Sequence, residues 1–409
     1  MNTPTIPVSS TAAPRAGLTG AAKGRPLRVA MICNFLEERW PSMDLVGDML
    51  CSHLAANCDN QVTVTQIRPA FKNRCTRVFE KPAFRNADLI LNRFADYPAW
   101  LRPRAGEYDL FHLVDHSYSQ LLHILPAGRT VVTCHDLDTF RCVLEPERDQ
   151  RPRWFRAMSR RILDGFRNAA HVIAVSEATR DELLRHRLVS PERISVVPNG
   201  VDPICSPQAD GPADLAATGL LPAPAGTPWL LSVGSTAPRK RLDVLLRVFA
   251  AVKRVMPEAG LVRVGGLSPE LEQLATELNI RPAIVTLPFL ARDLLAAIYR
   301  RAALLLQTSD AEGFGLPVVE AMASGCPVAA SDIPALREIG GTAVTYCPVA
   351  DVAFWQDAVV RLLREREQQP EAWARRRHHA VAHAEHFSWA ENARQAAVIY
   401  HQVYAAVAR

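Results

Sequence analysis

The chain has 409 residues, 48% of them hydrophobic and 22% charged, with a formal net charge of +5. This length leaves room for two domains that each bury a core, and the composition is ordinary for a globular protein. No run approaches 18 consecutive apolar residues, which argues against a membrane-spanning helix.

Residues 1–25 are rich in Ala, Thr, Pro and Gly and are predicted to be a disordered tail. They contain no apolar run long enough for a secretory signal. The nine cysteines of the chain include no Cys-x-x-Cys pair, so no zinc site is expected. Unpaired cysteines are typical of a reducing compartment, and we therefore expect a cytoplasmic protein.

The first half contains six short apolar runs, at residues 27–33, 61–67, 109–114, 130–136, 171–176 and 194–199. The runs are continuous rather than alternating, which is typical of parallel strands covered on both faces. The segments between them have helical spacing. Residues 26–202 are therefore predicted to form an α/β domain of the doubly wound, Rossmann-like class.

Residues 203–228 contain six prolines and are predicted to be a linker. Six more apolar runs follow, at residues 229–234, 261–266, 283–288, 303–309, 327–331 and 343–347. They predict a second Rossmann-like domain over residues 229–387. Because ligands bind at the carboxyl ends of such strands, two facing domains would hold them in a central cleft.

The most informative stretch is SDAEGFGLPVVEAMASG, residues 309–325. It follows an apolar run, and Gly313 and Gly315 permit a tight turn before a helix with Pro317 in its first turn. Free N–H groups at a helix N-terminus favour a phosphate. Glu312 lies in the turn and Glu320 lies one turn into the helix, so each carboxylate could accept hydrogen bonds from a pair of sugar hydroxyls.

Two further stretches follow apolar runs. In VGSTAPRKRLDVLL, residues 233–246, Arg239 and Lys240 stand where cations could clamp a diphosphate and stabilise charge on a leaving group. In VVTCHDLDTF, residues 131–140, His135 and Asp136 stand at the edge of the first domain that would face the cleft. A lone histidine is more often structural, but this position favours a functional role for His135.

These stretches, with HVIAVSEATRDEL, ISVVPNGVD and SDIPALREIGG, resemble the retaining GT-B glycosyltransferases of the fourth sequence family, from about residue 28 to 404. The resemblance implies that Glu312 binds the donor sugar, Glu320 the ribose, and Arg239 and Lys240 the diphosphate. It places His135 near the reacting centre and returns residues 388–409 to the first domain as a helix. Backbone amides would hold the sugar and its phosphate at Gly313, Phe314, Gly315 and Leu316.

The resemblance also implies the reaction. A sugar would move from a nucleotide-diphosphate sugar, UDP- or GDP-linked, to a hydroxyl of a glycan or lipid-linked acceptor. The anomeric configuration would be retained, and neither a metal nor a cofactor would be needed. Two alternatives stay open: a sugar-nucleotide epimerase of the same fold, and a non-catalytic protein that binds sugar nucleotides. A nicotinamide dehydrogenase is disfavoured, because no Gly-x-Gly-x-x-Gly follows the first apolar run.

Positive charge is concentrated in the first domain. Nine Lys and Arg but only three acids lie between Thr65 and Ala105, and RPRWFRAMSRR spans residues 151–161. A helix over 151–166 has two interpretations: an interfacial helix on an anionic membrane at its cytoplasmic face, or a core-packed helix with a solvated basic face. Nucleic acid is not an expected partner, because the basic stretches lack aromatic stacking motifs.

Overall fold

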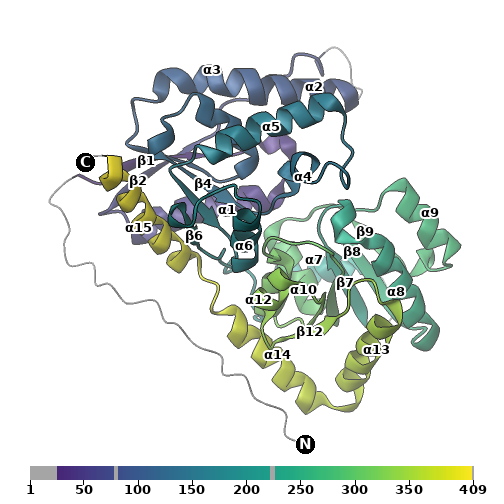
Figure 1. Cartoon of the computed structure of the whole chain (residues 1–409). Coiled ribbons are helices and arrows are strands. Elements are labelled where there is room, and N and C mark those ends of the chain that lie inside the picture. The colour runs from purple at the N-terminus through teal and green to yellow at the C-terminus, as the bar shows by residue number, and fades with distance from the viewer. Residues whose placement is uncertain (1–24, 78–81, 222–225, 408–409) are drawn as a thin grey trace, which may run out of the picture.

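The computed structural model describes residues 25–77, 82–221 and 226–407, which form two α/β domains (Figure 1). Except for Arg25, the predicted tail of residues 1–25 lies outside the described residues. The Arg25 guanidinium lies 2.7 Å from the Asp109 carboxylate. Within the described ranges, no helix combines the length and the apolar character that crossing a bilayer would require.

The N-terminal domain is built on a parallel sheet of six strands in the order β2-β1-β3-β4-β5-β6. All six predicted runs are strands: β1 (Leu27–Ile32), β2 (Val62–Ile67), β3 (Leu110–Leu113), β4 (Thr130–Cys134), β5 (His171–Ala174) and β6 (Ile194–Val196). In β1, Ala30 and Ile32 enter one core cluster, whereas Val29 and Met31 enter another. Apolar residues on both faces of the strand explain the absence of sequence alternation.

Helices cover both faces of this sheet. They are α1 (Pro41–Asn57), α2 (Pro82–Leu91), α3 (Tyr97–Leu101), α4 (Asp138–Leu144), α5 (Arg153–Arg167) and α6 (Glu177–Arg185). Helix α6 begins directly after β5, and the Ser176 hydroxyl accepts a hydrogen bond from the Thr179 amide as its N-cap.

The C-terminal domain repeats the architecture with the strand order β12-β11-β10-β7-β8-β9. The second set of predicted runs is also confirmed: β7 (Trp229–Val233), β8 (Gly260–Val264), β9 (Ile284–Leu287), β10 (Leu304–Gln307), β11 (Val328–Ser331) and β12 (Val344–Cys347). Its helices are α8 (Leu242–Val255), α9 (Pro269–Glu277), α10 (Arg292–Arg301), α11 (Leu316–Ala323), α12 (Pro334–Gly340), α13 (Val352–Gln368) and α14 (Pro370–Ala384). Strands β10 and β7 are neighbours, which brings the turns after them together.

The range 203–228, predicted as a linker, contains a helix, α7 (Gly211–Leu220). Ala213 and Ala217 are buried in the core of the C-terminal domain, and the Asp214 carboxylate lies 3.2 Å from Arg300 of α10. Much of this range therefore packs as part of the second domain. Within it, residues 222–225 lie outside the described structure.

The last helix, α15 (Trp389–Val407), lies against the N-terminal domain, as its position beside β1 and β2 in Figure 1 shows. Ala393, Ala397 and Tyr400 complete a core cluster with residues of β1 and α1. The Tyr400 hydroxyl lies 2.6 Å from Nδ1 of the buried His112 in β3. Helix α15 is thus packed against the sheet of the N-terminal domain.

Candidate active site

The acidic turn, residues 308–315, joins β10 to α11. Gly315 is the N-cap residue of α11 and has a φ of 102°, a left-handed conformation that glycine adopts without a steric penalty. Pro317 lies in the first helical turn. Across the described ranges, no hydrogen bond is donated by the backbone amides of Gly313, Phe314, Gly315 and Leu316. Free amides at a helix N-terminus form an anion-binding site.

The basic turn, residues 234–241, joins β7 to α8 and lies beside the acidic turn. The Asp310 amide donates to the Arg239 carbonyl at 2.9 Å, and the Thr308 hydroxyl donates to the Lys240 carbonyl at 3.1 Å. Behind the basic turn, the buried Arg263 of β8 donates to the carbonyls of Gly234 and Ser235 at 2.6 and 2.9 Å. These contacts fix both turns as one unit.

Two cations of the basic turn bind Glu312. Lys240 Nζ lies 2.6 Å from one carboxylate oxygen, and an Arg239 nitrogen lies 3.1 Å from the other. The Glu312 side chain is only 5% exposed. Burial would raise the pKa of this carboxyl, but the two cations outweigh burial and hold it at about 2. Glu312 is therefore a buried carboxylate that stays ionised because it is paired.

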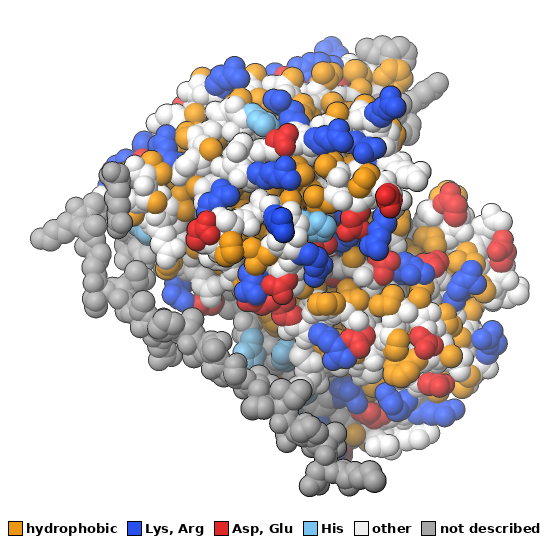
Figure 2. Space-filling view, viewed as in Figure 1, with side chains coloured by type: hydrophobic (Ala, Val, Ile, Leu, Met, Phe, Trp, Pro, Cys, Tyr) orange, Lys and Arg blue, Asp and Glu red, His pale blue; other side chains and the backbone are white. Residues whose placement is uncertain are grey.

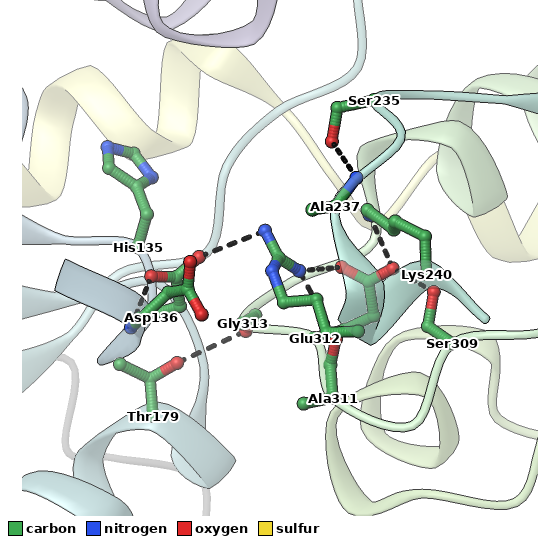
Figure 3. Close-up of polar contacts among 12 residues, drawn as sticks. His135, Asp136, Thr179, Ser235, Ala237, Lys240, Ser309, Ala311, Glu312 and Gly313 are labelled. Atoms are coloured by element: carbon green, nitrogen blue, oxygen red, sulfur yellow. Dashed lines mark hydrogen bonds and ion pairs between the residues drawn. The ribbon is translucent and has the colours of Figure 1, made fainter. Parts of the chain in front are cut away.

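Asp136, which follows β4, reaches the same cluster from the N-terminal domain. Its carboxylate lies 3.3 Å from Arg239, so Arg239 bridges Asp136 and Glu312 across the two domains. Figure 3 shows Asp136 and Glu312 on facing sides of this bridge. Arg239 Nε is buried and has no partner among the described residues, which leaves a donor for a further anionic group.

His135 lies on the N-terminal side of the site, but its ring points away from the ion pairs (Figure 3). Nε2 lies 2.7 Å from the Val114 carbonyl, so this nitrogen carries a proton. Burial lowers the pKa of His135, although the Asp115 carboxylate opposes the change. In this geometry the backbone of His135, rather than its ring, contacts the acidic turn: a Cβ placed on Gly313 would overlap the His135 carbonyl oxygen.

The N-terminal domain holds the acidic turn through hydroxyl groups. Ser176 Oγ and Thr179 Oγ1 both donate to the Gly313 carbonyl, at 2.6 and 3.2 Å. A separate contact joins the domains nearby, where the Glu338 carboxylate of α12 accepts from the amides of Glu177 and Ala178 at 2.8 and 3.1 Å. The turn thus faces the other domain and is held there.

Glu320, one turn into α11, has surroundings unlike those of Glu312. The Tyr299 hydroxyl of α10 donates to its carboxylate at 2.9 Å. Burial raises the pKa of Glu320 to about 7, while the Tyr299 hydrogen bond opposes the increase. Close to neutral pH this carboxyl therefore exists in both protonation states.

The structure brings Glu312, Arg239 and Lys240 into direct contact. It places Gly313, Phe314 and Gly315 in the acidic turn with Glu312, and Leu316 at the start of α11. Sequence reasoning did not assign roles to Asp136, Ser176, Thr179 or Arg263. Ser176 could have been found, because it follows a strand in the same way as His135. Among the described residues, no group of three or more His, Cys, Asp or Glu could hold a metal ion.

Family models match both domains. The model of glycosyl transferases group 1 matches residues 221–378, and that of glycosyltransferase family 4 matches residues 48–204. Together they cover most of the chain. The first range contains both turns of the site and Glu320, and the second contains Asp136, Ser176 and Thr179.

Curated relatives point the same way. The D-inositol 3-phosphate glycosyltransferase of Nocardia farcinica is 38% identical over 213 residues, which are 49% of this chain and 46% of the relative. The O-antigen chain mannosyltransferase RfbU of Salmonella typhimurium is 27% identical over 258 residues, 62% of this chain and 65% of the relative. The chain spans about half the length of the curated relatives that it matches first.

Solved structures share the fold over nearly the whole chain. Sucrose-phosphate synthase from Thermosynechococcus elongatus superposes with a TM-score of 0.71 at 21% identity, over 93% of this chain and 100% of its own. HepE from Anabaena, in complex with UDP and glucose, gives a TM-score of 0.67 at 19% identity, over 91% and 99%. At these identities the likeness concerns the fold alone.

The raised pKa of Glu320 predicts a pH-dependent stability. Between its ordinary pKa of 4.5 and about 7, the folded protein binds this proton more tightly than the unfolded chain. The free energy of unfolding should therefore fall as pH rises through this window, by about 1–3 kcal/mol for this group. Glu320→Gln keeps the acceptor for Tyr299 but does not titrate. Urea unfolding from pH 5 to 8 should show the wild type losing stability relative to the variant, and parallel curves would contradict the assignment.

Proposed function

Because the chain belongs to the group 1 glycosyltransferases of GT-B fold, we propose that it transfers a sugar from a nucleotide-diphosphate sugar to an acceptor hydroxyl. The donor is UDP- or GDP-linked, and the acceptor is a glycan or a lipid-linked saccharide. The observation that carries the proposal is the ion-pair cluster of Lys240, Arg239 and Glu312, set beside the free amides of the acidic turn.

Donor binding is an exchange of anions in this proposal. The diphosphate takes over Lys240 and Arg239 from Glu312, and the buried Nε of Arg239 and the free amides of residues 313–316 supply further donors. Glu312 is then free to accept hydrogen bonds from the sugar hydroxyls. Glu320 accepts from the ribose. HepE, which shares the fold, is solved with UDP, a nucleotide diphosphate of the proposed class.

Transfer proceeds with retention and without a metal. Retaining glycosidases use a second carboxyl group about 5 Å from the first, as a nucleophile. In the proposed donor complex the sugar hydroxyls occupy the Glu312 carboxylate, and Asp136 stays within 3.3 Å of Arg239, so neither carboxylate is presented as a free nucleophile. The leaving diphosphate, held by Lys240 and Arg239, instead takes the acceptor proton on the face from which it departs.

The acceptor side is the N-terminal domain, and its basic face favours an anionic membrane surface. Ile162, Leu163 and Phe166 of α5 are buried in the domain core, so only the other face of the helix is available. That face carries the exposed Arg153 and Arg160, and Trp154 is 59% exposed. Figure 2 shows Lys and Arg side chains across the N-terminal domain, the upper one in this view. Peripheral contact at the cytoplasmic face of the membrane would bring a lipid-linked acceptor to the cleft.

Nucleotide binding should depend on Lys240 and Glu320. At 100 times its dissociation constant, UDP or GDP should stabilise the wild type by about 2.7 kcal/mol, measured as a thermal shift. Lys240→Ala and Glu320→Ala should lose this shift. Arg254→Ala is the matched control, because Arg254 is an exposed cation of the same domain in the last turn of α8, at the other end of the helix from the basic turn. If both site variants show the same thermal shift as the wild type, the donor binds elsewhere in the protein.

The stereochemistry of the product tests the mechanism. We expect proton NMR of the initial product to show the anomeric configuration of the donor, and the rate to be unchanged in excess EDTA. A covalent glycosyl-enzyme trapped on Glu312 or Asp136 would contradict the leaving-group mechanism. Conversion of the donor to free nucleotide and a rearranged sugar, with no acceptor present, would favour the epimerase alternative. Binding without any turnover would favour the non-catalytic one.

Membrane contact should be electrostatic. The wild type should sediment with vesicles containing phosphatidylglycerol at low salt and be released at high salt. The double variant Arg153→Glu/Arg160→Glu should bind at least about tenfold more weakly, since each basic residue near an anionic surface contributes about 1 kcal/mol. Arg254→Glu/Arg364→Glu makes the same charge change on exposed residues of the other domain and should bind like the wild type. Equal loss in both variants would indicate net charge alone.

A further inference from the structure

Two hydroxyl groups of the N-terminal domain converge on one carbonyl of the acidic turn. Ser176 Oγ lies 2.6 Å and Thr179 Oγ1 lies 3.2 Å from the Gly313 oxygen. Both side chains are buried, with 0% and 2% exposure. Figure 3 shows the contact between Thr179 and Gly313, which joins α6 to the turn from the other domain. A single acceptor that takes two buried donors from another domain is held in one orientation.

The same residue touches the N-terminal domain on a second side. Gly313 lies so close to the His135 carbonyl that a Cβ would overlap that oxygen and press on Asp136 Cβ at 3.2 Å. No side chain therefore separates the acidic turn from the end of β4. Both contacts exist only when the two domains are close together.

The orientation of this carbonyl determines what the turn presents on its other side. In a planar trans peptide, the C=O of one residue and the N–H of the next point in opposite directions. Hydroxyls that hold the Gly313 carbonyl towards α6 therefore turn the Phe314 amide away from α6. No intramolecular acceptor takes this amide in the described residues, and Glu312 is the residue directly before Gly313.

We infer that Ser176 and Thr179 are positioning residues, which fix the 313–314 peptide from across the domain interface. They thereby place the Glu312 carboxylate and the Phe314 amide for the transfer reaction. This inference rests on the proposed glycosyl transfer and adds to it two residues of the N-terminal domain that orient the donor site. Neither hydroxyl needs to touch the substrate, because both act through the Gly313 carbonyl.

The domain interface offers a matched control. Glu338 of α12 also joins the two domains, but it accepts from the amides of Glu177 and Ala178 and does not contact the acidic turn. Glu338→Gln therefore changes a second contact between the domains and leaves the Gly313 carbonyl with both hydroxyls. Thr179→Val removes one hydroxyl at nearly constant shape, and Thr179→Ser restores it. Ser176→Ala also removes the N-cap of α6, so Thr179→Val must show the effect on its own.

The first measurement determines kcat and the KM for the donor separately in each variant. With release of UDP from UDP-glucose, or of GDP from GDP-mannose, as the assay, Ser176→Ala/Thr179→Val should lower kcat about ten- to a hundredfold. The KM for the donor should change less than about threefold, because the cations and Glu320 are intact. Thr179→Val should lower kcat to a lesser extent, and Thr179→Ser should recover the wild-type value. A rise in KM with unchanged kcat would overturn the inference.

The second measurement does not need turnover. Hydrogen exchange of the Asp310 amide, which donates to the Arg239 carbonyl at 2.9 Å within the acidic turn, should be faster in ligand-free Thr179→Val and in the double variant than in the wild type. Glu338→Gln should leave exchange in this segment unchanged. If the wild type releases no nucleotide from any donor, the proposed function fails while exchange still decides the role of the hydroxyls. Equal exchange in wild type, Thr179→Val and the double variant overturns that role, whatever the activity.

Discussion

The site depends on one interaction, the pairing of the buried Glu312 carboxylate with Lys240 and Arg239. A carboxylate with 5% exposure loses most of its hydration, and without partners it would be protonated. Removing one partner of a buried pair commonly costs about 3–5 kcal/mol, because the other charge is left uncompensated. The free protein therefore keeps both cations in place with its own acid. In the proposed donor complex the diphosphate brings the same sign of charge to the two cations, and hydrogen bonds from the sugar hydroxyls compensate the Glu312 carboxylate.

The ion-pair network of Glu312, Lys240 and Arg239 extends into the N-terminal domain, because Arg239 also binds Asp136. Each member of this ion-pair network lies in the segment that connects a parallel strand to the next α-helix. Arg263 holds the basic turn from behind, and the Asp310 amide ties the two turns of the C-terminal domain together. The N-terminal domain adds its hydroxyls to the Gly313 carbonyl. The geometry of the charged groups thus follows from backbone contacts more than from the flexible side chains themselves.

The sequence predicted all twelve strands, because parallel strands buried on both faces leave continuous apolar runs. It did not predict α7. The surrounding sequence is proline-rich and the buried residues of the helix, Ala213 and Ala217, are small, so the segment resembles a linker. The two turns could be placed at strand ends, but their pairing requires the neighbourhood of β7 and β10, which lie more than 70 residues apart in the chain. The position of a residue at a strand end also does not determine the direction in which its side chain points. His135 stands at the expected strand end, and yet its ring points to the Val114 carbonyl while Asp136 reaches the site.

Glu312 and Glu320 have identical side chains, but their surroundings shift the two pKa values in opposite directions. Burial acts on both, but the cations beside Glu312 lower its pKa to about 2, whereas Glu320 has a neutral phenol and its pKa rises to about 7. Glu312 stays ionised while it is paired, so it can hold Lys240 and Arg239 until a diphosphate arrives. A carboxyl that titrates near neutrality is only partly charged, so it can accept hydrogen bonds from a ribose without requiring a cation nearby. The two carboxyls of unequal pKa therefore suit different roles in the proposed reaction: Glu312 holds the cations until the donor arrives, and Glu320 accepts from a neutral polyol.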